Sequence, residues 1–190
     1  MRIVAGAFRG RRLNPPKGRA VRPTTDRVRE AVFSIIAARV PGARVLDLFA
    51  GTGAMGLEAL SRGAAHAVFV DRSPESIRLI QSNIALCNAS ERVAVIHDAA
   101  QRAIRRLEEQ GEKFDIVFLD PPYGERGVDN ALLALAPVAG RECLAVAERH
   151  IKDELPNRVG EWIMQDERRY GDSLISLFER EGRLELDGDG

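Results

Sequence analysis

The chain has 190 residues, which is enough for one domain with a hydrophobic core and too few for two ordinary domains. Its 28 basic and 28 acidic residues balance, and two cysteines exclude a disulfide framework, while no cysteine, histidine or acid spacing indicates a metal site. No apolar stretch could span a membrane and the first ten residues lack a signal-peptide core, so we expect a cytoplasmic protein.

Positive charge is concentrated at the start of the chain. Residues 1–30 hold nine basic residues and two acids, a net charge of +7, so residues 31–190 carry −7. This asymmetry favours a polyanionic partner, although a solvated N-terminus would also explain it. The stretch RIVAGAFRGRRLN (2–14) alternates apolar and polar residues around two glycines, which predicts a small hairpin.

A helix and then a regular strand–helix alternation follow the hairpin. Thr25 or Asp26 can cap the first helix, which Pro41-Gly42 ends. We expect strands at 43–49, 66–71, 92–97, 114–120 and 142–148, and helices at 54–62, 74–87, 100–110 and 129–139. Nearly continuous apolar strands separated by helices indicate a parallel sheet covered on both faces. Residues 161–180 alternate around a Tyr-Gly-Asp turn, which predicts a terminal antiparallel hairpin.

Four successive strands end in or near an aspartate, at Asp47, Asp71, Asp98 and Asp120. Because ligands bind beyond the carboxyl ends of the strands in an open parallel sheet, these acids would line one crevice. Each could alternatively cap the helix that follows.

The sequence GTGAMG (51–56) follows the first strand of the sheet and matches G-x-G-x-x-G, with Asp71 20 residues beyond Gly51. This spacing is typical of dinucleotide sites, but it also suits another adenosine cofactor or simple tight packing. Asp47 lies within the strand, where a dinucleotide site usually has an apolar residue, and would meet a ligand bearing an ammonium group.

The strand FDIVFLD runs into DPPY (120–123). Neither proline can donate a backbone hydrogen bond, and the residue before each is pushed toward an extended conformation. The chain therefore stops pairing and leaves Asp120 and Tyr123 at the end of the strand.

These motifs carry a family resemblance. LDLFAGTGAMGLEAL resembles the first motif of S-adenosylmethionine-dependent methyltransferases, and DPPY the fourth motif of those that methylate exocyclic amines. With RIVAGAFRGRRL, RPTTDRVREAVF and RRYGDSLISLF, the chain from Arg2 to about Glu179 resembles the bacterial 16S rRNA guanine-N2 methyltransferase family, RsmD.

The resemblance implies an α/β, doubly wound, mostly parallel seven-stranded sheet of class I (Rossmann-like) methyltransferase type, ending in an antiparallel hairpin. We expect residues 1–24 to form a basic N-terminal hairpin or arm for RNA, 25–186 the methyltransferase domain, and 187–190 a disordered tail. The implied cofactor is S-adenosylmethionine, and the implied partner is 16S rRNA, the small ribosomal subunit or its precursor particle.

The resemblance also assigns roles to residues. Asp120 and the Pro121 carbonyl would accept hydrogen bonds from the target amine, Pro122 would help to hold them in place, and the Tyr123 ring would stack on the base. The residues implied to bind the cofactor are Asp47, Phe49, Ala50, Gly51, Gly53, Asp71, Arg72, Asp98 and Ala99. The residues expected to bind RNA phosphates are Arg9, Arg11, Arg12, Arg22, Arg27 and Arg29.

Three other interpretations remain open. An amino methyltransferase acting on DNA adenine or cytosine, or on protein glutamine, would use the same DPPY logic, but DNA enzymes usually need a target-recognition domain for which 190 residues leave no room. An NAD-dependent oxidoreductase would leave DPPY unexplained and lacks a catalytic His–acid or Tyr–Lys arrangement. A catalytically silent RNA-binding scaffold would not need aspartates at the strand ends.

Overall fold

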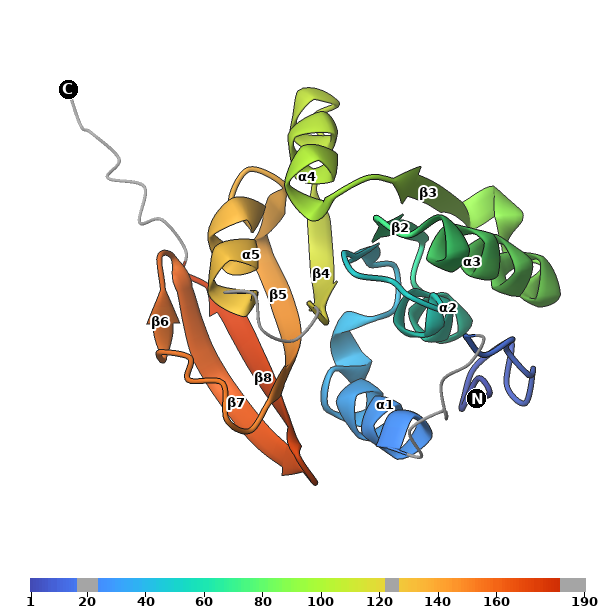
Figure 1. Ribbon diagram of the computed structural model, residues 1–190, viewed down its shortest axis with the longest axis horizontal. Coiled ribbons are helices and arrows are strands. Elements are labelled where there is room, and N and C mark those ends of the chain that lie inside the picture. Colours follow the sequence, from blue (N-terminus) through green and yellow to red (C-terminus); the bar gives the residue numbers. More distant parts are fainter. Residues whose placement is uncertain (17–23, 122–126, 182–190) are drawn as a thin grey trace.

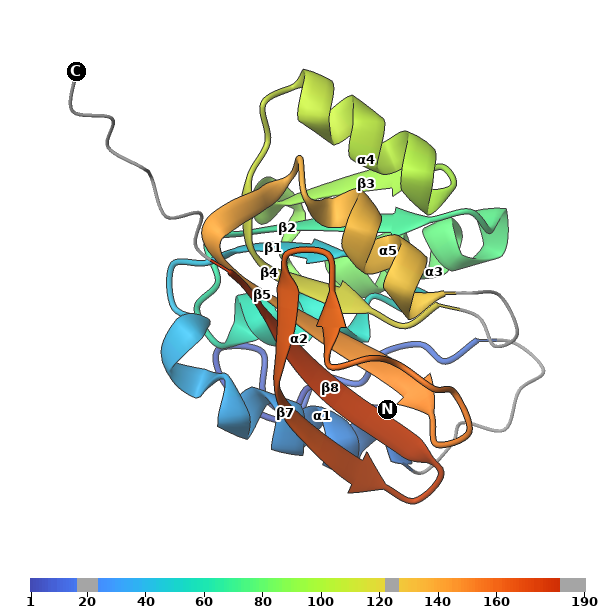
Figure 2. The ribbon, with the colours of Figure 1, turned by 90° about the vertical axis from the view of Figure 1, so that its left-hand side faces the viewer.

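A computed structural model describes residues 1–16, 24–121 and 127–181 of the chain. One sheet runs through the molecule, in the order β3-β2-β1-β4-β5-β8-β7-β6 (Figures 1 and 2). Strands β3, β2, β1, β4 and β5 pair in parallel with one another, whereas β8, β7 and β6 each pair antiparallel with the strand before them in this order. The strands are β1 (Arg44–Asp47), β2 (His66–Asp71), β3 (Val93–His97), β4 (Phe114–Leu119), β5 (Ala139–His150), β6 (Arg158–Val159), β7 (Trp162–Tyr170) and β8 (Ser173–Arg180).

The described sheet has eight strands, which corrects the expected seven. The additional strand, β6, consists of two residues that turn back at Gly160 and pair with the start of β7. Two residues are too few to show a period of two, so the sequence pattern carries no signal for this strand.

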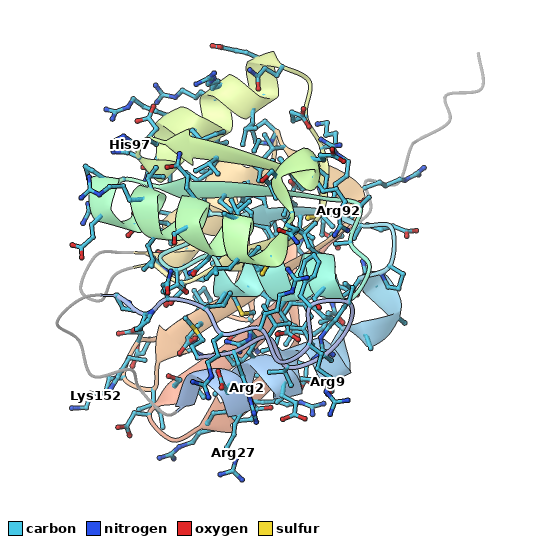
Figure 3. All side chains as sticks on the ribbon, turned by 90° about the vertical axis from the view of Figure 1, so that its right-hand side faces the viewer. Arg2, Arg9, Arg27, Arg92, His97 and Lys152 are labelled. Atoms are coloured by element: carbon cyan, nitrogen blue, oxygen red, sulfur yellow. The ribbon has the colours of Figure 1, made fainter. Side chains whose placement is uncertain are left out.

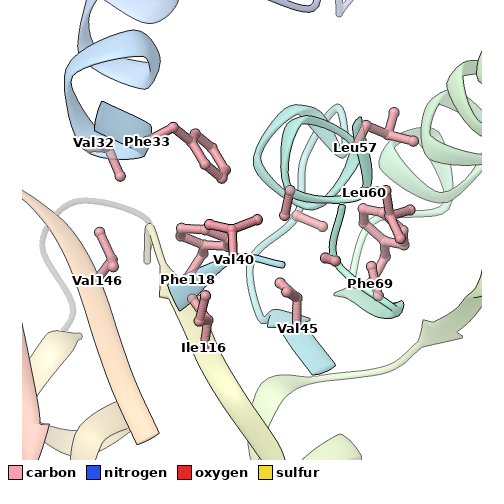
Figure 4. Close-up of a cluster of buried hydrophobic side chains, with 14 of the residues drawn as sticks. Val32, Phe33, Val40, Val45, Leu57, Leu60, Phe69, Ile116, Phe118 and Val146 are labelled. Atoms are coloured by element: carbon pink, nitrogen blue, oxygen red, sulfur yellow. The ribbon is translucent and has the colours of Figure 1, made fainter. Parts of the chain in front are cut away.

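Helices cover both faces of the sheet. The described helices are α1 (Thr24–Ile35), α2 (Ala54–Ser61), α3 (Pro74–Cys87), α4 (Ala100–Glu109) and α5 (Val128–Leu135), with short 3-10 turns at Ala37–Arg39 and Ser90–Arg92. Helices α1, α2 and α3 share one hydrophobic cluster with one face of the sheet, while α4 and α5 pack on the other face. Figure 4 shows the first cluster, in which the rings of Phe33 and Phe118 lie 5.6 Å apart.

Strand β4 shows why the predicted strand at 114–120 is an almost continuous run of apolar residues. Ile116 and Phe118 pack in the α1–α2–α3 cluster, whereas Val117 and Leu119 pack in the α4–α5 cluster. Successive side chains of a strand point to opposite faces, and here both faces are buried.

Helix α5 ends four residues before its predicted end at 139, and β5 begins at Ala139. Pro137 accounts for the difference, because it has no N–H to donate and so cannot continue the hydrogen bonding of the helix. Helix α3 follows its prediction: the Ser73 hydroxyl accepts from the Ser76 N–H at 3.3 Å, and Pro74 occupies the first turn.

The predicted N-terminal hairpin is a compact loop with a single bridge between Arg2 and Arg12. Ile3 N–H donates to the Arg11 carbonyl at 3.0 Å. Ile3, Phe8 and Leu13 are buried in the α1–α2–α3 cluster. The described part of this segment therefore packs as part of the common core, and the predicted tail at 187–190 lies outside the described residues.

Candidate functional site

The carboxyl ends of β1 to β4 surround a crevice of about 860 Å³. A smaller cavity of about 250 Å³, called the side hollow below, adjoins the crevice. The two share Phe49, Gly51, Thr52 and Asp120 in their walls. Asp120 therefore lies where the two spaces meet.

The structure brings nearly all of the predicted cofactor residues to these spaces. The crevice is lined by Phe49, Gly51, Asp71, Arg72, Asp98 and Ala99, and the side hollow by Asp47, Phe49, Ala50 and Gly51. Gly53 lines neither cavity; it is buried with φ of 75° at the start of α2 and shapes the loop from behind.

The glycine loop needs its third glycine for packing. A Cβ at Gly56 would lie 2.3 Å from the Phe69 ring, so no larger residue fits between α2 and β2. Gly51, with φ of 54°, adopts the left-handed conformation that brings its N–H toward Asp71. The motif is therefore required by the turn and by helix–sheet packing as well as by any ligand.

Asp71 is held by two backbone donors. Its Oδ2 accepts from Gly51 N–H at 2.9 Å and its Oδ1 from Ser73 N–H at 2.8 Å. Each oxygen of an ionised carboxylate has a second acceptor site, so Asp71 can still accept from ligand hydroxyls in the crevice.

Asp47 is buried, with 4% of its surface exposed, and its Oδ2 accepts from Gly56 N–H at 3.0 Å. Burial raises the pKa of Asp47 to about 7; the Asp71 charge also raises it, while the hydrogen bond from Gly56 opposes the shift. A cationic ligand group in the side hollow would favour the ionised form.

Asp98 has an internal partner that the sequence analysis missed. Its Oδ1 accepts from Arg102 Nε at 2.6 Å and from Ala99 N–H at 2.7 Å. The hydrogen bond from Arg102 is the largest of the causes that lower the pKa of Asp98, so this carboxylate is ionised. The four-residue spacing between Asp98 and Arg102 is visible in the sequence and could have predicted this contact.

Asp120 follows the last residue of β4 and is exposed, with Pro121 beside it in the crevice wall. Pro122 and Tyr123 lie outside the described residues. A further acid, Glu148, lines the side hollow from β5. It ends the predicted strand ECLAVAE, so the pattern of strands ending in an acid extends to a fifth strand that the sequence analysis did not count.

The predicted RNA-binding arginines differ in their surroundings. Arg9, Arg12 and Arg27 are exposed, and Figure 3 shows Arg9 and Arg27 on one side of the molecule, near the N-terminal segment and α1. Arg11 donates to the Leu86 carbonyl at 2.7 Å and lies over the Phe8 ring. Arg22 lies outside the described residues.

Arg29 departs from the expected surface position. It is only 2% exposed and forms ion pairs with Glu58 at 3.2 Å and Asp26 at 2.9 Å. Its guanidinium also donates to the backbone carbonyl of Arg2. The cause is tertiary: the N-terminal segment covers this face of α1, so Arg29 joins segments of the chain and does not face solvent.

Within residues 1–16, 24–121 and 127–181, no helix is long and apolar enough to cross a membrane. The same residues contain no group of three or more histidines, cysteines or acids arranged to hold a metal ion.

Comparison with known proteins gives a consistent set of relatives. The family model described as Conserved hypothetical protein 95 matches residues 1–179. The ribosomal RNA small subunit methyltransferase D of Escherichia coli K12 is 35% identical over 192 residues, covering 100% of this chain and 94% of its own. A Bacillus subtilis protein with the provisional name rRNA methyltransferase YlbH is 37% identical, covering 96% of this chain and all of its own.

A solved structure from Escherichia coli, provisionally named methyltransferase yhhF, has the same fold. It superposes with a TM-score of 0.84 at 34% identity, over 96% of this chain and 99% of that one.

Proposed function

The chain belongs to the family described as Conserved hypothetical protein 95, the RsmD family, and from this premise we propose that it transfers a methyl group from S-adenosylmethionine to the N2 amine of a guanine in 16S rRNA. The coarser activity, rRNA methylation, rests on full-length similarity to the small subunit methyltransferase D of Escherichia coli. The choice of guanine N2 rests on DPPY and on the site around Asp120.

The position of Asp120 carries the proposal. Asp120 lines both the crevice and the side hollow. A methyl donor that lies in the crevice with its methionine end at the side hollow, and an amine presented from the side hollow, would therefore meet beside one carboxylate. Positioning two reactants in this way supplies a large part of the rate enhancement of a direct displacement.

The residues of the crevice, together with Asp47 in the wall of the adjoining side hollow, fit S-adenosylmethionine. The buried Asp47 carboxylate, whose pKa is raised to about 7, suits the ammonium of the methionine part. Asp71, fixed by Gly51 and Ser73, can accept from the ribose hydroxyls, and Asp98 with Ala99 would lie near the adenine. When bound, this cofactor supplies an electrophilic methyl group on a positively charged sulfur.

Asp120 and Pro121 would act on the nucleophile. The lone pair of a guanine amine is delocalised into the ring, so the amine is a weak nucleophile. A carboxylate and a carbonyl that accept from its two N–H groups draw it toward a pyramidal form and favour the positive charge that develops on nitrogen. The Tyr123 ring would stack on the base, a contact worth roughly 1–3 kcal/mol.

The exposed arginines of the N-terminal segment and α1 would hold the RNA. Arg9, Arg12 and Arg27 can contact phosphates without reading sequence. The target base must be unpaired or flipped, because its amine is inaccessible in a stacked helix. The substrate is small-subunit rRNA or a particle that contains it, and the enzyme would act in the cytoplasm, where such particles assemble.

Methyl transfer to ribosomal particles tests the proposal. Small subunits lacking the modification, and free 16S rRNA in parallel, are incubated with the enzyme and S-adenosylmethionine labelled in its methyl group. The rRNA is then digested and its nucleosides are separated. Label in N2-methylguanosine supports the proposal, whereas label in a methylated adenosine or cytidine, or in protein, favours the alternative amino acceptors.

A further inference from the structure

Glu148 on β5 lies level with Asp120 at the end of the neighbouring parallel strand. The register of the pair matches Phe118 with Val146 and Leu119 with Ala147, so the next positions are Asp120 and Glu148. Adjacent strands lie about 4.8 Å apart. The two carboxylates therefore lie at paired positions of two neighbouring strands, where β4 ends.

Both acids also share a face of the sheet. Phe118 and Val146, two residues earlier on each strand, pack in the α1–α2–α3 cluster. Because side chains alternate along a strand, Asp120 and Glu148 point toward the same side. Both line the side hollow, in agreement with this alternation.

Glu148 is oriented by a buried hydroxyl. Ser173 Oγ, at the start of β8, donates to Glu148 Oε1 at 2.9 Å, and Ser173 is 5% exposed. Among the described residues, no group donates to the other oxygen of Glu148, which is only partly buried. One oxygen is therefore held from within the protein, and the second can accept from a ligand.

The walls of the side hollow suit a flat, apolar-faced ring. Val32, Phe118, Val146 and Ile175 contribute to them, while acids occupy part of the lining. A flipped base is recognised in such a pocket by apolar contacts on its faces and by hydrogen bonds at its Watson–Crick edge.

We propose that Glu148 accepts the N1–H of the target guanine and so determines which base is methylated, an inference that rests on the function proposed above. Guanine presents N1–H and the N2 amine side by side, so Glu148 and Asp120 would each face a donor. Adenine has a lone pair at N1 and cytosine one at N3. Either would oppose the carboxylate and leave it without a partner, which is how a hydrogen-bonding site rejects the wrong substrate.

The variant Glu148→Gln tests this assignment with two RNA substrates. One substrate has guanine at the methylated position, and the other carries 2-aminopurine there. Both are prepared as free rRNA or as particles, whichever the wild-type enzyme modifies. The analogue keeps the N2 amine but has an acceptor at N1. Glu142→Gln, an exposed position at the other end of β5, is the matched control.

The wild type and Glu142→Gln should strongly prefer guanine. Glu148→Gln should lose roughly 10- to 100-fold in kcat/KM on guanine, the range for one charged hydrogen bond. Its activity on 2-aminopurine relative to guanine should rise, because the glutamine amide can donate to N1. Ser173→Ala, which frees the carboxylate without removing it, should reduce kcat/KM on guanine less and leave the melting temperature near that of the wild type.

In Glu148→Gln, an unchanged ratio of kcat/KM on guanine to kcat/KM on 2-aminopurine would overturn the assignment. So would a loss of S-adenosylmethionine affinity in variants that melt like the wild type, because Glu148 would then belong to the cofactor site. Failure of the proposed function looks different: the wild type itself would form no N2-methylguanosine, and both proposals would be removed.

Discussion

The backbone N–H of Gly51 donates to Asp71 Oδ2 at 2.9 Å, joining the glycine loop after β1 to the end of β2. The two residues are 20 positions apart in sequence. One carboxylate therefore both fixes the loop and faces the crevice, so the loop geometry and the acceptor for ribose hydroxyls depend on the same side chain.

Replacing Asp71 with alanine should weaken binding of S-adenosylhomocysteine or S-adenosylmethionine by roughly 1.5–3 kcal/mol, because a charged hydrogen-bond partner is lost. Isothermal titration calorimetry measures the change, with Asp172→Asn in the exposed β7–β8 turn as the control. A wild type that binds NAD but not S-adenosylmethionine would contradict the assignment of the crevice.

Cofactor affinity should rise with pH through about 7. Burial raises the pKa of Asp47 to about 7, so below this pH the residue is protonated and cannot pair with an ammonium group. Below this pH, binding of the cofactor to ionised Asp47 therefore releases up to one proton from the protein. The affinity should fall by up to about tenfold for each pH unit below the pKa. Calorimetry in buffers of different ionisation enthalpy detects this release. Asp47→Asn should bind more weakly and lose this pH dependence; an equal proton release in that variant would assign the titration to another group.

Asp120→Asn should lower kcat about 10²- to 10³-fold while the affinity for S-adenosylmethionine changes little, because Asp120 acts on the amine in the transition state. The measurement compares turnover on saturating rRNA with cofactor affinity from calorimetry. Wild-type turnover in this variant would end the proposed role of Asp120.

Arg29→Ala should destabilise the fold by about 1.5–3 kcal/mol, since it removes one charged partner of the buried Glu58 carboxylate, which keeps Arg62 at 2.9 Å. Glu58 is fully buried and accepts from Val4 N–H at 2.8 Å, Ala5 N–H at 3.0 Å and Arg29 Nε at 3.2 Å. Arg27→Ala, two residues earlier and exposed, should leave stability unchanged. Urea unfolding compares the two, and equal midpoints would show that the Arg29–Glu58 contact contributes little.

Replacing Arg9, Arg12 and Arg27 together with alanine should weaken RNA binding and make it less dependent on salt. Each lost phosphate contact reduces the counterion release that drives binding, by a slope of roughly 0.7–0.9 per contact. Cofactor affinity should not change. The control replaces three other exposed arginines, Arg105, Arg106 and Arg141. Identical salt slopes for wild type and the first triple variant would mean that these residues are merely solvated.

The strand–helix order and the crevice could be predicted because they depend on local pattern. Apolar runs marked β1 to β5, and a strand that ends in an acid marks the ligand-binding edge of a parallel sheet. DPPY also stood out locally, since two consecutive prolines stop strand pairing. The two-residue strand β6 and the early end of α5 were missed because element boundaries depend on short-range details that a period does not carry.

What the sequence by itself determined was the α/β class, the glycine loop and four acids at strand ends. Only the tertiary structure decided which side chains share a space. Arg27 and Arg29 look alike in sequence, yet only Arg29 is buried, because the N-terminal segment and Glu58 meet on its side of α1. Asp120 and Glu148 are 28 positions apart and become neighbours only through the register of β4 and β5. Burial and register arise from contacts between distant segments, and no local pattern of residues contains them.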